Sequence, residues 1–283
     1  MRNLVSLDAV DYLAIGHVAH DLIANGPRLG GTVTYSALTA KALGLKVGIV
    51  TSVGKETSLD ALDGIPVVSI ESPQSTTFEN IYTPERRMQY LRAQAEKINF
   101  DMIPASWRDA SIIHLGPIAN EIDSTLPDGL SPELLGVTPQ GWMRKWDSDG
   151  RVSRSEWSNS KTALKSAGAV VISREDVNGD NELIEQMAHQ TRMLVVTEGA
   201  EGCVLHWNGD RRRFRAPEVN EVDATGAGDI FAAAFFVRLL DTRDAWEAAR
   251  FATLIASRSV TRSGLEGIPT PQEIEECKME VLQ

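Results

Sequence analysis

The 283-residue sequence has few cysteines, fewer basic than acidic residues and no long apolar run. Its two cysteines, Cys203 and Cys277, lack the number and spacing of a disulfide framework or a zinc site, so bystander or buried thiols are expected. No segment approaches the roughly 18 to 20 uninterrupted apolar residues that a membrane span requires. The first residues also lack the apolar stretch and cleavage site of a secretory signal. We therefore expect a cytoplasmic protein without a membrane partner.

The charge balance is acidic, with 39 Asp and Glu against 28 Lys and Arg and a formal net charge of −11. Such a balance opposes non-specific nucleic-acid binding, and no nucleic-acid partner is expected. The one basic run, Arg211 to Arg213, follows Asn208-Gly209-Asp210 and is interpreted as a solvated turn or strand edge. His17 and His20 stand three residues apart, but no Cys or third His nearby completes a metal site.

Short runs of Val and Ile alternate with longer amphipathic or Ala-rich segments, which is typical of βαβ units around a mostly parallel sheet. The expected buried strands are Tyr12–Ile15, Val47–Val53, Val67–Ile70, Ile112–Leu115, Val170–Ser173 and Leu194–Thr197, with Gly202–Trp207 as an antiparallel addition. The expected helices are Thr32–Leu43, Ser160–Ser166, Asn181–His189, Asp229–Leu240 and Ala245–Ser257. No linker divides the chain, so residues 1–283 are expected to form a single α/β domain.

Residues 75–96 break this alternation. Polar residues there alternate with large apolar or β-branched ones, which places Phe78 and Tyr82 on one face of a strand. Thr83-Pro84-Glu85 favours a turn, and Met88–Leu91 a returning strand. The pattern predicts a hairpin outside the main sheet. A flap over a site and an edge hairpin without function both fit it.

The segment Val222-Asp223-Ala224-Thr225-Gly226-Ala227-Gly228-Asp229 is a glycine-rich turn that leads into the apolar stretch 230–236. That stretch predicts a buried helix. Gly226 and Gly228 let the main chain come close to a ligand, and the amides at a helix start, here including Ala227, carry partial positive charge. Such a turn can hold the charge that develops on a transferring phosphoryl group.

Asp229 stands at the same helix start, and two interpretations of it are open. A carboxylate there can cap the helix. It can also accept a hydroxyl proton, since in-line phosphoryl transfer pairs a base at the acceptor with positive dipoles at the phosphate. Other glycine motifs do not fit. Gly54-Lys55 lacks the upstream glycine of a Walker A loop, and Phe231 stands where a dinucleotide fingerprint needs its third Gly or Ala.

Two segments resemble the signatures of the ribokinase-like (PfkB) carbohydrate kinases. Asp223 to Asp229 resembles their C-terminal signature, an Asp and small residues before Gly-Ala-Gly-Asp at a helix start. Gly30-Gly31 through Leu43-Gly44 resembles their N-terminal signature, a glycine pair that leads into an Ala-rich helix. The signatures are in the family's order and the resemblance covers nearly the whole chain. It implies a doubly wound, mostly parallel α/β sheet with helices on both faces, and a small β lid from residues 16–31 and 75–96.

The resemblance also implies residue roles. Asp229 would be the catalytic base, beside the anion-binding turn of Gly226, Ala227 and Gly228. Asp21 would hold substrate hydroxyls, Gly30 and Gly31 would bring the main chain against the substrate, and Tyr35 would shape the pocket where the family often has Asn. The loop from Thr197 through Gly199 to Gly202 would lie along the nucleotide, and Ser257 and Gly264 would help to build an adenine pocket. The family's Asn-x-x-Glu aligns with Ser173 to Asp176, which makes Asp176 the expected metal ligand and Ser173 a cofactor contact.

The activity that the resemblance implies is phosphorylation of an alcohol of a sugar or cyclic polyol, with ATP and Mg²⁺ as cofactors. Tyr35, His20-Asp21, Gly116-Pro117 and Gln140-Gly141 are similar to the inositol-kinase branch, which favours a myo-inositol-like acceptor. The expected partners are this small-molecule acceptor and ATP, and a homodimer is one option for the assembly.

Two alternatives stay open at this point. One is a nucleoside kinase of the same family, which more aromatic residues in the lid than Phe78, Tyr82 and Tyr90 would favour, because bases stack on aromatic rings. The other is a catalytically silent relative that binds a ligand. The presence of Asp229 together with the Gly-Ala-Gly turn argues against silence.

Overall fold

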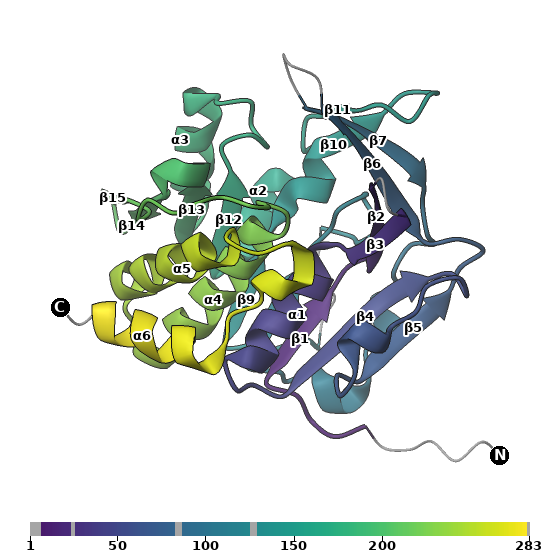
Figure 1. Ribbon diagram of the computed structural model, residues 1–283, viewed down its shortest axis with the longest axis horizontal. Helices are drawn as coiled ribbons and strands as arrows, with labels where there is room; N and C mark the ends of the chain where they lie inside the picture. Colours follow the sequence, from purple (N-terminus) through teal and green to yellow (C-terminus); the bar gives the residue numbers. More distant parts are fainter. Residues whose placement is uncertain (1–6, 24–25, 83–86, 125–128, 282–283) are drawn as a thin grey trace.

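The computed structural model describes residues 7–23, 26–82, 87–124 and 129–281. Its central sheet contains the parallel strands β1 (Tyr12–Ile15), β4 (Val47–Val53), β5 (Val67–Glu71), β8 (Ile112–Leu115), β9 (Leu134–Val137), β12 (Ala169–Ser173) and β13 (Met193–Thr197). The antiparallel strands β14 (Cys203–Trp207) and β15 (Asp210–Phe214) extend one edge. The order is β15-β14-β13-β12-β9-β8-β1-β4-β5 (Figure 1).

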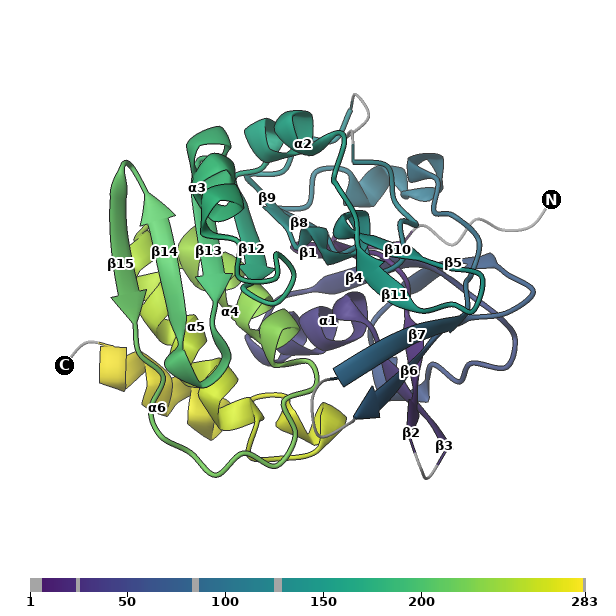
Figure 2. The same cartoon turned by 90° about the horizontal axis from the view of Figure 1, so that it is seen from above.

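Helices cover both faces of this sheet, as Figure 2 shows from above. One face carries α1 (Thr32–Ala42), α4 (Ala227–Thr242), α5 (Ala245–Ser259) and α6 (Pro271–Val281), and the other α2 (Ser160–Ser166) and α3 (Asn181–Gln190). The strands are buried on both sides because successive side chains enter different cores: Val171 packs under α4 and α5, whereas Val170 and Ile172 pack under α2 and α3. The predicted doubly wound fold is therefore confirmed.

The predicted strands and helices are present to within about two residues of their expected ends. β9 and α6 were not predicted. β9 has only four residues, one of them Gly136, where a Cβ would lie 2.6 Å from the ring of Phe236 on α4. The basic run Arg211 to Arg213 lies in the exposed edge strand β15, as expected.

A separate four-stranded sheet has the order β3-β2-β6-β7. It joins β2 (Ala19–Ile23) and β3 (Gly26–Gly30) to the predicted hairpin, now β6 (Thr76–Tyr82) and β7 (Arg87–Ala93). The expected turn at 83–85 lies outside the described residues. Phe78 anchors this sheet by packing against Ile118 and Ala119, close to the two-stranded β10 (Arg144–Trp146) and β11 (Val152–Arg154). That this small sheet works as a lid within one domain stays a prediction.

The order of the strands marks one edge of the main sheet for ligand binding. From β1 the chain continues to β4 and β5 on one side and then returns to β8 on the other, so its direction reverses between β1 and β8. Open α/β sheets bind ligands at the carboxyl ends of strands at such a point. Here Gly16 follows β1 and Gly116 follows β8, and a Cβ on Gly16 would lie 2.4 Å from the Gly116 carbonyl oxygen. The two main chains touch at the switch point.

The cysteines, His17 and the lengths of the helices bear on disulfides, metal binding and membrane spans. Cys203 and Cys277 are buried free thiols, as expected. Both ring nitrogens of His17 are hydrogen-bonded within the protein, Nε2 to the Glu96 carbonyl oxygen at 2.8 Å and Nδ1 to the Thr76 hydroxyl at 2.7 Å. Within the described ranges, no helix is long and apolar enough to span a bilayer.

A buried hydrogen-bond chain crosses the centre of the sheet. The Tyr12 hydroxyl lies 2.8 Å from His114 Nδ1, and His114 Nε2 lies 2.9 Å from the Thr138 hydroxyl. Burial lowers the pKa of His114 to about 3. The neutral imidazole, which has one donor and one acceptor nitrogen, matches two hydroxyl neighbours.

This burial predicts a pH dependence of stability. Folded His114 stays neutral, whereas the unfolded chain takes up a proton below about pH 6.5, so the free energy of unfolding should fall as the pH drops from about 6.5 towards 3. The slope from this one group approaches about 1.4 kcal/mol per pH unit. Chemical denaturation between about pH 7 and 5 should show a smaller loss in His114→Gln than in the wild type. His189→Gln, at an exposed imidazole, is the control. Equal slopes in all three proteins would contradict the prediction.

Candidate active site

Asp229 lies in the first turn of α4, three residues after the N-cap. The N-cap is Gly226, in the left-handed region at φ 79°, and the hydrogen bond from Ile230 N to its carbonyl oxygen (2.9 Å) begins the helix. The N-cap residue is therefore Gly226, which has no side chain. Asp229 is not the N-cap carboxylate of the capping interpretation, and it lies half-buried in the first turn of the helix.

The surroundings of Asp229 shift its acidity. Burial raises the pKa of Asp229 to about 6, a hydrogen bond with the Thr32 side chain and the charge of Arg144 act in the opposite direction, and the charges of Asp176 and Asp21 add to the rise. These partners come from α1, from the start of β10, from the turn after β12 and from β2. Segments far apart in the sequence thus meet at the carboxyl edge of the main sheet.

The two glycines of the turn play different parts. A Cβ on Gly226 would lie 2.4 Å from ring atoms of Tyr35, so this glycine allows α4 to sit on α1. Beyond the adjoining helix backbone, no atom of the described residues lies within 4 Å of a Cβ built on Gly228, so this face of the turn is open there. The Ala227 amide donates to the Ala224 carbonyl oxygen at 3.2 Å. Helix geometry leaves the amides of Gly228 and Asp229 without intrahelical partners, which suits them to an anion.

Tyr35 has its ring in the core and only 1% of its surface exposed. Its hydroxyl is buried and has no hydrogen-bond partner among the described residues. Burial raises the pKa of Tyr35, the charge of Arg28 lowers it, and the charges of Asp21 and Asp229 raise it further. The hydroxyl therefore lies within reach of the charges of Arg28, Asp21 and Asp229, which together with Asp176, Asp223 and Arg144 form the charged cluster of the site. The ring packs against Gly226 of the glycine turn.

The glycine pair at 30 and 31 shapes the acceptor side. A Cβ on Gly30 would lie 2.4 Å from Asp21 Oδ2, so the carboxylate lies directly over β3. Gly31 has a φ of 90°, and a Cβ there would lie 2.5 Å from the His17 carbonyl oxygen. The pair allows Asp21 and the start of α1 to lie close together.

Asp176 lies in the turn after β12, where both of its carboxylate oxygens accept hydrogen bonds. Its Oδ2 accepts from the Ser173 amide at 2.9 Å and its Oδ1 from Gln140 Nε2 at 2.9 Å. The Ser173 hydroxyl accepts from the Glu175 amide at 3.1 Å. Mg²⁺ is commonly held by one or two carboxylates together with substrate phosphates and water. Asp176 beside Asp229 fits that requirement, because each carboxylate oxygen has a second lone pair.

The residues expected to hold a nucleotide come from several elements, and two of them, Ser173 and Thr197, are partners in neighbouring strands. Gly199 follows β13, and apart from its chain neighbours no described atom lies within 4 Å of a Cβ built there. Gly202 is buried, with a Cβ position 2.0 Å from the Phe214 carbonyl oxygen, which gives it a packing role. The Ser257 hydroxyl is buried and donates to the Thr253 carbonyl oxygen at 2.7 Å. The Gly264 amide donates to Asp223 at 3.0 Å.

Three residues of the cluster, Thr32, Arg28 and Arg144, were not predicted. Arg144 lies with its Cζ 5.5 Å from the ring centroid of Phe78 in the small sheet and donates to the Ile118 carbonyl oxygen at 3.3 Å. No motif in the sequence indicates this contact, since it depends on how β10 meets β6. For Thr32, the only feature of the sequence that could have indicated a place in the site is its position directly after the glycine pair.

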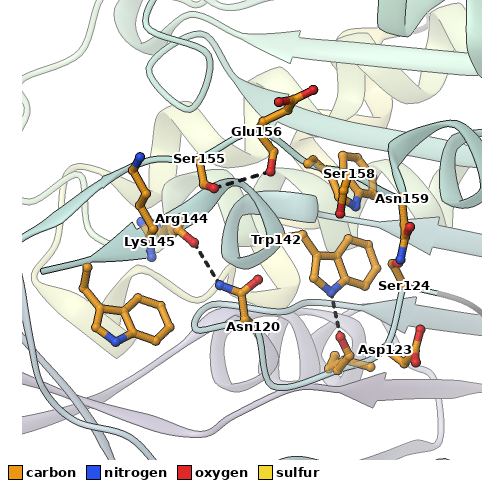
Figure 3. A pocket seen from close by; sticks show the side chains of 13 residues that line it. Asn120, Asp123, Ser124, Trp142, Arg144, Lys145, Ser155, Glu156, Ser158 and Asn159 are labelled. Atoms are coloured by element: carbon orange, nitrogen blue, oxygen red, sulfur yellow. Dashed lines mark hydrogen bonds between the residues drawn. The ribbon is translucent and has the colours of Figure 1, made fainter.

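Arg144 also lines a cavity of about 510 Å³, shown in Figure 3. Trp142 stands among its side chains and stacks on Trp157 with a centroid distance of 5.2 Å, while Lys145 lies beside Arg144. None of the predicted site residues lines this cavity. Arg144 is the residue that the cavity and the carboxylate cluster share.

Known proteins are similar to this chain in sequence. A family model described as pfkB family carbohydrate kinase matches residues 165–272, which include Asp176, the glycine turn and Asp229. A cytidine kinase from Thermococcus kodakarensis is 28% identical over 250 residues, covering 80% of this chain and 87% of that protein. An inositol 3-kinase from Oryza sativa subsp. japonica is 23% identical over 288 residues, covering 93% and 71%.

Solved structures show the same fold. A pyrophosphate-dependent kinase of the ribokinase family in complex with sulfate has a TM-score of 0.79 at 22% identity, with 94% of this chain and 99% of that chain covered. Another such structure, with a pyrophosphate analog and myo-inositol, has a TM-score of 0.76 at 23% identity and the same coverage. The family match over residues 165–272 and these relatives make the chain similar in sequence to the PfkB carbohydrate kinases, and the solved structures show that it has the ribokinase-like fold.

Proposed function

We propose that this kinase transfers the γ-phosphoryl group of ATP to a hydroxyl of a sugar or cyclic polyol, with a myo-inositol-like acceptor favoured. One observation carries the proposal. The Asp229 carboxylate stands in the first turn of α4 next to Gly228, whose Cβ side is open, and the Asp21 carboxylate acts on the same group. A base, an anion site and a hydroxyl-binding group thus meet at one point.

In the proposed reaction, the oxygen of the acceptor hydroxyl bonds to the γ-phosphorus of ATP. The ionised Asp229 accepts the proton that this hydroxyl loses. The bond from that phosphorus to the bridging oxygen breaks, and ADP leaves with the electron pair. The amides of Gly228 and Asp229 and the α4 dipole face the charge that develops on the phosphoryl oxygens. Mg²⁺, when bound by Asp176 and the donor phosphates, would supply further positive charge.

The acceptor side favours a polyol over a nucleoside. Asp21 presents two acceptor oxygens, which suits adjacent hydroxyls. Base stacking would need an available aromatic face in the small sheet. Phe78 is buried against Ile118 with Arg144 over its ring, and Arg92 covers Tyr90 at 4.5 Å from the ring centroid. Both aromatic side chains of the small sheet that the structure describes are therefore already occupied, and the side chain of Tyr82 lies outside that description.

The comparisons favour two variations on this proposal. The 28% identity to a cytidine kinase favours a nucleoside acceptor. Two structures with the same fold, at 22% and 23% identity, are those of pyrophosphate-dependent kinases, which makes pyrophosphate the second donor to test. The internal hydrogen bonds of Ser257 and Gly264 also leave fewer groups for an adenine than the family resemblance implies.

The role of Asp229 predicts a defined kinetic defect. Asp229→Asn should lower kcat by about 10² to 10⁴, because the amide cannot take the proton. In the wild type, kcat/KM should rise with pH through about 6 and then level off, since the base works only when ionised. Initial rates of product formation between about pH 5 and 8 check both points. A variant that keeps a tenth of the wild-type kcat would remove Asp229 from this role.

The same substitution should stabilise the protein. Because the folded pKa of Asp229 is about 6 and the unfolded value is near 3.9, ionisation costs stability as pH rises from about 4 to 6 and the full cost persists above 6. Asp229→Asn escapes this cost, which amounts to at most about 3 kcal/mol. Denaturation at pH 8 should show a gain that disappears near pH 4. A loss of stability at pH 8 would speak for a structural carboxylate instead.

Substrate choice is tested with a matrix of acceptors and donors. We expect turnover with myo-inositol or a related polyol as acceptor and ATP as donor. Pentoses and nucleosides are the competing acceptors, and GTP and pyrophosphate the competing donors. Asp21→Ala should raise KM for the preferred polyol by at least tenfold, since a hydrogen bond to a charged group contributes about 1.5 to 3 kcal/mol. Turnover of cytidine or adenosine alone would overturn the polyol assignment. Use of pyrophosphate alone would overturn ATP.

A further inference from the structure

An ion pair ties the small sheet to the turn that carries Asp229. Arg28, in β3, donates through Nη1 to Asp223 Oδ2 at 2.8 Å, across 195 positions of the sequence. The two side chains are only 22% and 18% exposed, so solvent screens this pair less than the exposed pairs of the surface. The pair therefore attaches β3 of the small sheet to the segment that precedes α4.

Asp223 collects further donors from both sides of the site. Its Oδ1 accepts from the Thr225 amide at 2.9 Å, inside the glycine turn. Its Oδ2 also accepts from the Gly264 amide at 3.0 Å and the Ser263 hydroxyl at 3.3 Å. The Arg28 side chain covers Gly264, where a Cβ would come within 3.1 Å of Nη1. One carboxylate therefore joins the small sheet, the anion-binding turn and the loop at 263–267.

Arg28 also belongs to the acceptor side of the site. In the β2–β3 hairpin it stands directly opposite Asp21, and opposite residues of an antiparallel pair lie on the same face. Its Nε is buried and, like the Tyr35 hydroxyl, has no hydrogen-bond partner among the described residues. Any movement of the hairpin that carries Asp21 must move Arg28 as well.

We propose that Arg28 is a positioning residue that couples the acceptor-binding hairpin to the phosphoryl-transfer turn through Asp223. The inference rests on the proposed function in its assignment of Asp21 to the acceptor. When the hairpin places Asp21 over Gly30, it also brings Arg28 into its ion pair with Asp223. Arg28 thereby aligns the amides of Gly228 and Asp229 only when the acceptor side is in place.

Kinetics of Arg28→Gln, Asp223→Asn and the double variant test the coupling, with Arg243→Gln, in an exposed ion pair with Glu133, as the control. Each single variant should lose at least tenfold in kcat, with a change in acceptor KM of less than threefold. The double variant should be no slower than the slower single one, and Arg28→Lys should recover part of the rate. Losses that multiply in the double variant, or a kcat above half of the wild-type value in Arg28→Gln, would overturn the proposal.

A second measurement does not depend on turnover. Hydrogen–deuterium exchange without ligand should accelerate in Arg28→Gln within 222–229 and 261–268, far from residue 28 in the sequence, and should be unchanged in Arg243→Gln. Unaltered exchange in both segments would overturn the coupling. If the wild type turned over no acceptor of the panels, the proposed function would fail, while accelerated exchange in these two segments would still support the coupling.

Discussion

Four carboxylates, those of Asp21, Asp176, Asp223 and Asp229, gather at the carboxyl edge of the sheet, and the repulsion among them is the constraint that the surrounding structure must meet. All but Asp176 affect the pKa of the buried Tyr35, and Asp176 acts on Asp229. Like charges this close destabilise one another unless hydrogen bonds or cations compensate. The compensation is unequal, and that inequality separates the roles of the four groups.

Asp223 and Asp229 are the extremes. Although burial alone would raise the pKa of Asp223, hydrogen bonds with Thr225, Arg28 and the Gly264 amide bring it well below its ordinary value. Asp229 has one such bond, with Thr32, and burial prevails. Environments that separate the pKa values of two similar groups assign them different tasks. Asp223 stays ionised and structural, whereas Asp229 holds a pKa near the range in which a base can exchange a proton.

The sequence predicted those parts of the fold and the site that depend on local patterns. Val- and Ile-rich runs such as Val47–Val53 are buried strands because both faces of the parallel sheet are covered, and Gly226 to Asp229 is a turn and helix start. β9 was missed because a four-residue strand with a glycine has no periodicity to detect. Arg28 and Arg144 could not be predicted, since their roles arise from contacts with Asp223 and Phe78 that only the tertiary fold creates. The buried settings of Gly202 and Ser257 have the same origin.

The positive charge available to a phosphoryl donor depends on the small sheet. A donor with several negative charges must enter a site that is itself acidic, in a chain whose formal net charge is −11. The two arginines near Asp229 and Tyr35 are both attached to that sheet: Arg28 is part of β3, and Arg144 lies over the ring of Phe78 in β6. A shift of the sheet would therefore move Arg28 with it and would remove the ring contact of Arg144, which itself belongs to β10. Under the proposed function, the arrangement would link stabilisation of the phosphoryl group to the position of the strands that carry Asp21, which is the condition for transfer to an alcohol in preference to water.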